Sequence, residues 1–313
     1  MKIVFMGTPD FAVPSLEILL KNNYTISAVV TAPDKPRGRG QQVSFTPVKE
    51  CAQKYSLPIF QPQSLKDPQF IAQLAELKPD LFVIVAFRIL PKEVYSIPDK
   101  GAFNLHASLL PKYRGAAPIN WAIISGEKES GVTTFFLQDK VDTGNIILQE
   151  KVTITDEMNA GELHDALSDI GSRAVLETVQ RIEQGIANPQ KQNDLLASPA
   201  PKIFKETCRI DWNQSTEKIH NFIRGLSPYP AAWTSHNGKV VKIFKSRRTE
   251  NEIQNSGFKI HGAGEILVSE KQLFVAAENS VLEILELQQE GKKRMSAEEF
   301  LRGYRFAENS GFD

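Results

Sequence analysis

A continuous apolar run, DLFVIVAF at residues 80–87, constrains the fold more than any other segment of the chain. A run without polar residues at alternate positions is typical of a central strand that is covered on both faces. Around it, short apolar runs alternate with stretches in which apolar residues recur at helical spacing. This alternation predicts an α/β domain with a doubly wound, mostly parallel sheet. In such sheets, ligands bind beyond the carboxyl ends of the strands.

The elements of the first half can be placed along the sequence. Strands are expected at residues 2–7, 26–32, 58–60 and 80–87, and helices at 13–22, near 48–55 and at 68–77. Two further strands, 131–138 and 145–155, flank the tetrapeptide VDTG, and a long amphipathic helix is expected over 160–184.

The composition changes after residue 184. Residues 184–206 are rich in Pro, Ala and Lys without a clear period, which is typical of a linker. Short strands separated by turn residues follow, at 232–235, 239–246, 264–269, 272–276 and 281–288, with helices near 216–225 and 296–302. They predict a small barrel or sandwich. We therefore expect a first domain over residues 1–188, a linker over 189–206 and a second domain over 207–313.

Composition excludes several classes of protein. The formal net charge is zero, so a polyanionic partner must be met by a local basic patch. The opening MKIVFMG already reads as a strand, no apolar run approaches the roughly 20 residues that span a bilayer, and a cytoplasmic protein with no membrane contact is expected. Cys51 and Cys208 lie far apart without CxxC spacing, so neither a disulfide framework nor a zinc site is indicated.

The segment FNLHASLLPKYRGAAPINWAI, residues 103–123, carries the candidate chemistry. Because side chains at i and i+2 share one face of a strand, Asn104 and His106 are expected to point together into one cleft. Asp142, within VDTG, follows downstream. An amide, an imidazole and a carboxylate suffice to acylate an amine without a covalent enzyme intermediate. Asn104 or protonated His106 would stabilise the oxyanion, and His106, oriented by Asp142, would move protons.

Other chemistries lack their residues. There is no GxSxG motif, and neither cysteine has a histidine close in sequence. Ser108 stands directly before two leucines and a proline, as in a turn. The loop GTPDFAV, residues 7–13, has a single glycine in place of GxGxxG, which disfavours a nicotinamide dehydrogenase.

NLHASLLPKYRGAAPINWAI together with QDKVDTGNII resembles the signature of the 10-formyltetrahydrofolate-dependent formyltransferases. The resemblance is narrowed to the branch that formylates methionyl-tRNA by the segments GTPDFAVPSLE, APDKPRGRG and APKIFKETCRIDW. It extends into the second domain through SPYPAAWT and GKKRMSAEEFLRGY. The resemblance implies a Rossmann-like catalytic domain followed by an OB-like β-barrel that binds tRNA. It also implies formyl transfer from N10 of the co-substrate 10-formyltetrahydrofolate to the methionine amino group of initiator Met-tRNA, without a metal.

The resemblance also assigns residues. Asn104, His106 and Asp142 fall on the catalytic positions of the family, and Ser108, Leu109, Leu110 and Pro111 fall on the loop that holds the formyl-folate. One departure is the pair Phe87-Arg88, where many relatives carry a Tyr-Gly-like pair beside the pterin pocket. The departure concerns the detail of that pocket and leaves the reaction unchanged.

Two basic segments are candidates for contact with nucleic acid. The loop TAPDKPRGRGQQ, residues 31–42, contains Lys35, Arg37 and Arg39. It is either a basic finger that reaches phosphates or base edges, or a solvated surface loop. The resemblance to the family's tRNA-engaging loop favours the first, with Arg37 or Arg39 at the acceptor end of the tRNA.

The second segment, residues 239–248, has no acidic residue and contains Lys239, Lys242, Lys245, Arg247 and Arg248. Strand alternation predicts that Lys239 and Lys245 share a face. The segment is either a phosphate-binding patch or a charged barrel edge that prevents strand pairing. The resemblance favours tRNA binding, and Lys202 in the linker is expected to face the tRNA as well.

Two rival functions remain open at this point. The same chemistry could act on a purine-pathway ribonucleotide or an amino-sugar nucleotide, but a glycinamide-type enzyme has no need of the second domain. A non-catalytic tRNA-binding protein that kept the fold would have no need of Asn104, His106 and Asp142. We expect a monomeric enzyme.

Overall fold

The computed structural model describes residues 1–313 except 38–41, 250–260, 279 and 308. The described residues form two compact units. The first comprises Met1–Pro118, Glu129–Thr153 and His164–Ala200, and the second comprises Ile119–Lys128, Ile154–Leu163 and Pro201–Asp313. Two short segments that lie between stretches of the first unit in the sequence are therefore built into the second unit. The expected domain limits at residues 188 and 206 stay a prediction.

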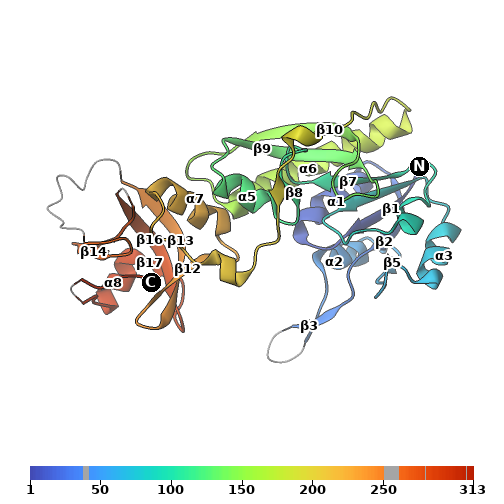
Figure 1. Ribbon diagram of the computed structural model, residues 1–313. Coiled ribbons are helices and arrows are strands. Elements are labelled where there is room, and N and C mark those ends of the chain that lie inside the picture. The colour runs from blue at the N-terminus through green and yellow to red at the C-terminus, as the bar shows by residue number, and fades with distance from the viewer. Residues whose placement is uncertain (38–41, 250–260, 279, 308) are drawn as a thin grey trace. The chain divides into compact units, whose positions relative to one another are not determined.

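The first unit is built on a seven-stranded sheet with the strand order β10-β9-β7-β6-β1-β2-β5 (Figure 1). Its strands are β1 (Lys2–Gly7), β2 (Thr25–Val30), β5 (Ile59–Phe60), β6 (Leu81–Val85), β7 (Ala102–His106), β9 (Glu129–Phe136) and β10 (Ile146–Thr153). The first five of these pair in parallel, β9 runs antiparallel to β7, and β10 runs antiparallel to β9. The predicted doubly wound, mostly parallel sheet is confirmed.

Helices cover both faces of this sheet. The unit contains α1 (Val13–Lys21), α2 (Pro47–Lys54), α3 (Pro68–Glu76), α4 (Lys92–Tyr95) and most of α6 (Ala160–Glu183). On one face Met6 and Ile84 pack with Leu74 of α3 and Val94 of α4. On the other, Leu105 packs so closely on Gly171 of α6 that a Cβ there would lie 2.8 Å from Leu105 Cδ2. Every residue of β6 is buried, which explains the apolar run at residues 80–87.

The helix starts carry local signals. Thr46 Oγ1 accepts a hydrogen bond from Lys49 N at 3.1 Å at the start of α2, and Asp67 Oδ1 accepts from Gln69 N at 3.0 Å at the start of α3. A proline follows each cap at the first helical position, where its missing N–H costs nothing. The predicted helices therefore begin where the sequence places a cap.

The basic loop after β2 contains a hairpin of β3 (Lys35–Arg37) and β4 (Gln42–Ser44). Its base is tied by three polar contacts: Lys49 Nζ pairs with the Asp34 carboxylate, Gln61 Nε2 donates to Asp34 Oδ1 at 2.8 Å, and the hydroxyls of Thr31 and Thr46 lie 2.7 Å apart. The two ends of the hairpin are thus fixed on the first unit.

The second unit is an antiparallel sheet with the order β12-β13-β16-β15-β14, and β17 pairs with β16. Its elements are β12 (Ala232–His236), β13 (Lys239–Arg248), β14 (Ile266–Ser269), β15 (Gln272–Ala276), β16 (Val281–Gln289), β17 (Met295–Ser296), α5 (Pro118–Ile124), α7 (Thr216–Leu226) and α8 (Ala297–Gly303). Core residues Ile243 and Leu287 of the sheet pack with Ile223 of α7 and Phe300 of α8. The smaller antiparallel β domain is confirmed.

Residues 310–313 connect the two outer strands of that sheet. Ile266 N at the start of β14 donates to Ser310 O at 2.9 Å, while Asp313 N donates to Ser235 O of β12 at 3.0 Å. His236 Nδ1 lies 3.0 Å from Gly311 O. This segment therefore supplies backbone partners along the gap between β12 and β14.

Two buried polar side chains of α7 hold residues 154–163 within the second unit. Arg224 Nη1 donates to Thr155 O at 3.0 Å and to Met158 O at 2.8 Å. His220 lies between Ser246 Oγ, 3.0 Å from Nδ1, and Asp156 O, 3.2 Å from Nε2. Burial lowers the pKa of both groups, and for His220 it favours the neutral ring. No helix in the described part of the chain is long and apolar enough to cross a membrane.

Candidate active site

Asn104 and His106 lie at the carboxyl end of β7, as the sequence predicts. Leu105 packs toward α6, so the side chains of Asn104 and His106 lie on the opposite face of the strand. Asn104 is half-buried, and its side-chain amide makes no hydrogen bond with another residue of the described ranges. The amide is therefore available to a ligand at the edge where parallel sheets bind their ligands.

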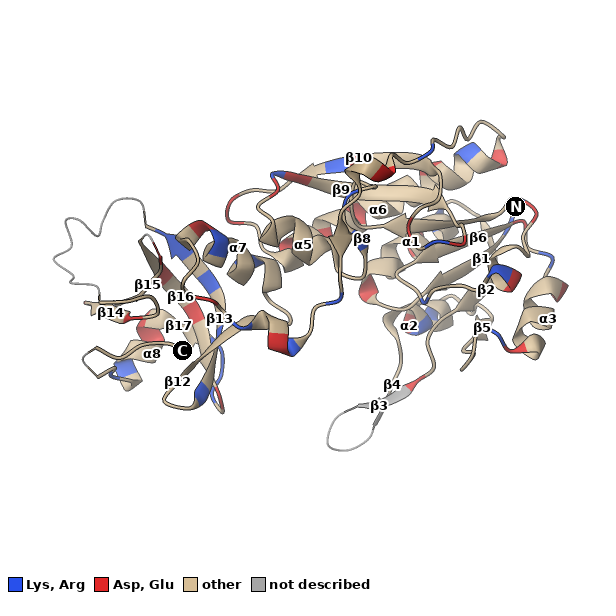
Figure 2. Ribbon diagram, viewed as in Figure 1, with Lys and Arg blue, Asp and Glu red and all other residues tan. Residues whose placement is uncertain are grey.

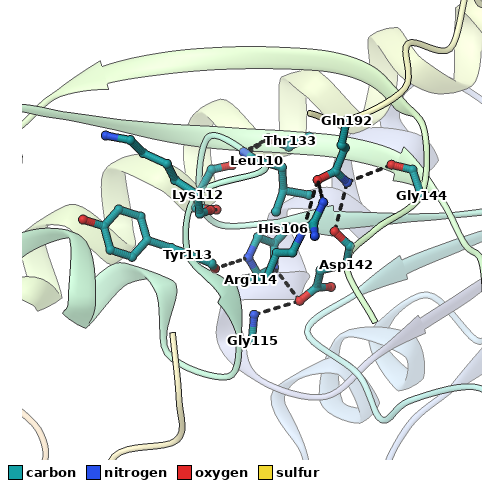
Figure 3. Close-up of polar contacts among 11 residues, drawn as sticks. His106, Leu110, Lys112, Tyr113, Arg114, Gly115, Thr133, Asp142, Gly144 and Gln192 are labelled. Atoms are coloured by element: carbon teal, nitrogen blue, oxygen red, sulfur yellow. Dashed lines mark hydrogen bonds and ion pairs between the residues drawn. The ribbon is translucent and has the colours of Figure 1, made fainter. Parts of the chain in front are cut away.

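The His106 ring is held by contacts to both nitrogens (Figure 3). Nε2 lies 2.8 Å from Tyr113 O, and Nδ1 lies 3.8 Å from Asp142 Oδ2. Because a carbonyl only accepts, Nε2 carries a hydrogen, and Nδ1 is the nitrogen that faces the Asp142 carboxylate. The exposed fractions of the His106 and Asp142 side chains are only 7% and 10%, so their electrostatic interaction is weakly screened. The structure brings these two predicted residues together.

Asp142 lies in the turn between β9 and β10, with a positive φ of 55°. Its Oδ2 accepts a hydrogen bond from Gly115 N at 2.9 Å. Gly115 has φ 128°, and a Cβ at this position would lie 2.6 Å from Ala200 O. A Cβ on Gly144 would lie 1.6 Å from Phe136 O. Close backbone packing therefore explains the glycine of VDTG and the glycine that holds Asp142.

The predicted folate loop, Ser108 to Pro111, is fixed from β9 and β10. Thr133 Oγ1 donates to Ser108 O at 2.6 Å and accepts from Leu110 N at 3.1 Å. Gln149 Nε2 donates to Leu110 O at 2.9 Å. The buried Ser108 hydroxyl donates to Lys112 O at 2.6 Å, so it serves the loop itself. Leu109 and Pro111 are the partly exposed members.

Sequence reasoning missed Arg114 and Gln192, which surround the Asp142 turn. Gln192 Nε2 donates to Asp142 O at 2.9 Å and to Gly144 O at 2.8 Å. Arg114 Nη2 donates to Gln192 Oε1 at 2.7 Å and to Asp194 Oδ1 at 2.7 Å, and it lowers the pKa of Asp194. Gln192 lies in the stretch read as a linker, where no pattern marks it.

Arg88, the residue at which the chain departs from the family pattern, is tied to the segment before α3. Its Nη2 donates to Pro62 O at 2.9 Å and its Nη1 to Gln63 O at 3.2 Å. The guanidinium carbon lies 5.2 Å from the centre of the Phe87 ring. Partial burial lowers the pKa of Arg88. The side chain thus braces the chain that follows β6.

The predicted basic residues of the second unit lie on β13 (Figure 2). Lys239, Lys245 and Arg247 are exposed and Lys242 is half-buried. The prediction that Lys239 and Lys245 share a face is wrong, because the pairing with β16 shifts register between Ile243 and Ser246. Before this irregularity the odd-numbered Val241 and Ile243 face the core; after it the even-numbered Ser246 is buried.

The basic candidates differ in their partners. Arg247 Nε donates to Glu283 Oε2 at 2.7 Å, and Glu283 is buried, so part of its charge is neutralised within the sheet. Lys202 is exposed, and its Nζ lies 5.4 Å from the Phe204 ring centre. Lys35 and Arg37 lie on β3. Arg39 lies outside the described residues.

No group of three or more His, Cys, Asp or Glu residues in the described ranges could hold a metal ion. Cys51 and Cys208 are both buried thiols, and burial raises the pKa of each.

The sequence model described as "Formyl transferase" matches residues 1–179, and that described as "Formyl transferase, C-terminal domain" matches residues 202–305. The chain is also 47% identical over 320 residues to the methionyl-tRNA formyltransferase of Bacteroides fragilis, covering 98% of this chain and 96% of that protein. The chain belongs to the methionyl-tRNA formyltransferase family. A second member of the family, from Chlorobium phaeovibrioides, is 49% identical over 308 residues, covering 97% and 96% of the two chains.

Solved structures share the fold at lower identity. The N-formyltransferase of Helicobacter canadensis, in complex with folinic acid and dTDP-3-aminofucose, has a TM-score of 0.70 at 24% identity and covers 94% of this chain and 100% of its own. The methionyl-tRNA formyltransferase of Clostridium thermocellum has a TM-score of 0.55 at 17% identity and covers 80% and 94%. These two likenesses establish the fold alone.

Proposed function

We propose that this protein transfers the formyl group of 10-formyltetrahydrofolate to the methionine amino group of initiator Met-tRNA. The observation that carries the proposal is the match over 97–99% of the chain to methionyl-tRNA formyltransferases at 46–49% identity, together with the pairing of His106, at the end of β7, with Asp142. A folate-derived donor is supported by the family and by the folinic acid named with the Helicobacter canadensis structure.

The reaction is a direct displacement. The amine lone pair forms a bond to the formyl carbon, and the carbonyl π electrons move to the oxygen. Asn104 donates an N–H to this oxyanion. Neutral His106 takes the proton that the amine loses at Nδ1, beside the Asp142 carboxylate, and the resulting imidazolium places positive charge next to the oxyanion. When the carbonyl re-forms and the bond from the formyl carbon to N10 breaks, this proton passes from His106 to N10 and tetrahydrofolate leaves.

The contacts of each group support the role proposed for it. The Asn104 amide has no partner in the described part of the protein, so donating to the oxyanion breaks no internal hydrogen bond. The contact of His106 Nε2 with Tyr113 O leaves Nδ1 as the proton-exchanging atom, next to Asp142. We propose that the loop from Ser108 to Pro111 holds the formyl-folate, with Leu109 and Pro111 on the ligand side and Ser108 and Leu110 as internal support.

We propose that the tRNA is met by the basic hairpin and by β13. Lys35, Arg37 and Arg39 belong to the hairpin segment, whose base is tied to the first unit. Lys239, Lys242 and Lys245 present exposed or half-exposed charges, whereas Arg247 contributes less because it already pairs with Glu283. Lys202 adds a further exposed charge. We further propose that the enzyme acts as a monomer in the cytoplasm.

The test is a transfer assay with labelled 10-formyltetrahydrofolate. Met-tRNA, glycinamide ribonucleotide and a dTDP-amino sugar are supplied in parallel as acceptors. Formylation of Met-tRNA alone is expected. Transfer only to the ribonucleotide or the sugar would overturn the acceptor, and binding of Met-tRNA without transfer to any acceptor would indicate a non-catalytic tRNA-binding protein.

A further inference from the structure

The turn that carries Asp142 is held by a buried side chain from outside the family motifs, that of Gln192. Its two amide hydrogens go to Asp142 O at 2.9 Å and to Gly144 O at 2.8 Å. One side chain thereby fixes the main chain on both sides of Thr143 (Figure 3). Gln192 is only 5% exposed, so water competes little for these hydrogen bonds.

Arg114 determines which way the Gln192 amide points. Its Nε and Nη2 donate to Gln192 Oε1 at 3.2 and 2.7 Å. A guanidinium has donors and no acceptor, so the oxygen of the amide must face Arg114 and the NH2 group must face the two carbonyls. A reversed amide would place the NH2 group of Gln192 against the N–H groups of Arg114, and its oxygen against the carbonyl oxygens of Asp142 and Gly144.

The backbone around Arg114 contacts both members of the proton-exchanging pair. Tyr113 O lies 2.8 Å from His106 Nε2, and Gly115 N donates to Asp142 Oδ2 at 2.9 Å. These contacts form a closed ring beside His106. The ring consists of the backbone of residues 113–115, the Gln192 side chain and the Asp142 turn. The ring is anchored by Arg114 N, which donates to Ser198 O at 2.9 Å.

Asp142 needs such support because its φ of 55° is sparsely populated for a residue with a Cβ. We propose that Gln192, oriented by Arg114, is a positioning residue that keeps the Asp142 carboxylate against His106. The proposal rests on the proposed function, in which Asp142 and His106 exchange the reaction's protons. Without the two hydrogen bonds the turn can relax toward a negative φ and carry the carboxylate away from the ring.

Two substitutions distinguish the role of the Gln192 amide oxygen, which faces Arg114, from that of its NH2 group, which faces the turn. Gln192→Met keeps the length of the side chain and removes every hydrogen bond. Gln192→Glu keeps an acceptor for Arg114 and replaces the NH2 group by an oxygen that faces two carbonyl oxygens. If Gln192 acts through the Asp142 turn, both variants fail; if it serves only as a partner for Arg114, the glutamate variant works normally.

We expect both variants to lose kcat by up to about 100-fold, since a displacement of about 1 Å can cost that much. KM for the folate and for Met-tRNA should change by less than about twofold, because the residues proposed to bind the two substrates lie outside the turn. Gln190→Glu, the same chemical change at an exposed glutamine of the same segment, should retain the wild-type kcat.

A double-mutant cycle distinguishes positioning from general stability. In an Asp142→Asn background, Gln192→Met should lower kcat no further, because residues that act as one unit are not additive. A full multiplicative loss in that background, wild-type kcat in Gln192→Glu, or a change confined to KM would each overturn the proposal. Wild-type protein without transfer to Met-tRNA would instead overturn the proposed function.

Arg114→Lys serves as a second variant should the buried Gln192 substitutions prevent folding, because the Arg114 side chain is 17% exposed. Lysine keeps a positive charge near Asp194 but cannot donate two hydrogen bonds to Gln192 in the fork geometry of arginine. It should lower kcat in the same direction as the Gln192 variants, again without additional loss in the Asp142→Asn background. Wild-type kcat in Arg114→Lys would overturn the proposal.

Discussion

The surroundings of His106 and the basic strand β13 place polar groups in opposite ways. His106 and Gln192 are buried, the Asp142 side chain is only 10% exposed, and each of the three has contacts from separate parts of the chain. Lys239 and Lys245 stand exposed on a strand whose buried residues belong to a different core. In the first arrangement, hydrogen bonds hold the polar atoms in defined positions. In the second, the exposed side chains supply positive charge without a fixed geometry.

We propose that this difference separates chemistry from recognition. Proton transfer depends on distance and orientation, so it belongs to the buried groups. Attraction of a polyanion depends on the number of cations and falls with salt, so it tolerates mobile side chains. Substitutions around His106 should therefore change kcat, and substitutions on β13 should change the tRNA dependence and its salt sensitivity.

The largest effect is expected for Asp142→Asn. Asparagine keeps an oxygen for Gly115 N but loses the negative charge that faces His106 Nδ1. We expect kcat to fall about 10²- to 10⁴-fold, the range of a lost acid–base group, with little change in KM. Steady-state kinetics check this. Asp139→Asn, at an exposed carboxylate in the same β9–β10 connection, is the matched control and should turn over normally. Near-normal turnover of Asp142→Asn would contradict the acid–base role proposed for Asp142.

A smaller effect is expected for Thr133→Val, which keeps the shape of the side chain. It leaves Ser108 O and Leu110 N without their hydroxyl partner in a buried setting. The free energy of unfolding should fall by about 1–3 kcal/mol, and KM for the folate should rise more than KM for tRNA. Urea unfolding and steady-state kinetics measure both. Thr153→Val, at the exposed end of β10, should change neither. An unchanged folate KM in a destabilised Thr133→Val protein would contradict the assignment of the loop.

The charges of β13 should give a weaker, salt-dependent effect. Replacing Lys239, Lys242 and Lys245 by Gln should raise KM for tRNA at moderate salt and leave kcat intact. The slope of log(kcat/KM) against log salt should flatten by about 0.9 for each lysine that neutralises a phosphate. A control with Lys66, Lys78 and Lys100 replaced, three exposed lysines of the first unit, makes the same change in net charge. Equal effects of the two triple variants would show that the net charge of the protein matters and that β13 is not a specific tRNA-binding patch.

The smallest effect concerns pH and the second unit. Burial lowers the pKa of His220 below that of the unfolded chain, near 6.5. Below pH 6.5 the unfolded state binds a proton that the folded state does not, so stability is full above this pH and is lost as the pH falls. The slope from one group is at most about 1.4 kcal/mol per pH unit. Urea unfolding from pH 8 to 5.5 should show a greater loss in the wild type than in His220→Gln. An equal loss in both would contradict the assignment.

The sequence predicts those parts of the fold that depend on local pattern. The uninterrupted apolar strand β6 and the helices α2 and α3 appear where the sequence indicates them. The pairing of Asn104 with His106 follows from strand geometry alone. The register irregularity in β13 was missed because alternation in one strand carries no information about its partner β16.

The support of the site could not be predicted for a related reason. Gln192 contacts the Asp142 turn 50 residues away, and Gly115 contacts the Asp142 carboxylate 27 residues away. A glutamine in a segment rich in Pro, Ala and Lys has the same local signature as an exposed one. Motifs therefore marked the residues for which we propose the chemistry, whereas the groups proposed to position them became visible only through contacts made across the chain.

The separation of chemistry from recognition is tested most directly by single-turnover formyl transfer at saturating 10-formyltetrahydrofolate and saturating Met-tRNA. We predict that Asp142→Asn is slowed by about 10²- to 10⁴-fold at every salt concentration, while the variant lacking Lys239, Lys242 and Lys245 matches the wild type. A triple lysine variant that is slow at saturation, beside an Asp142→Asn enzyme of normal rate, would contradict it.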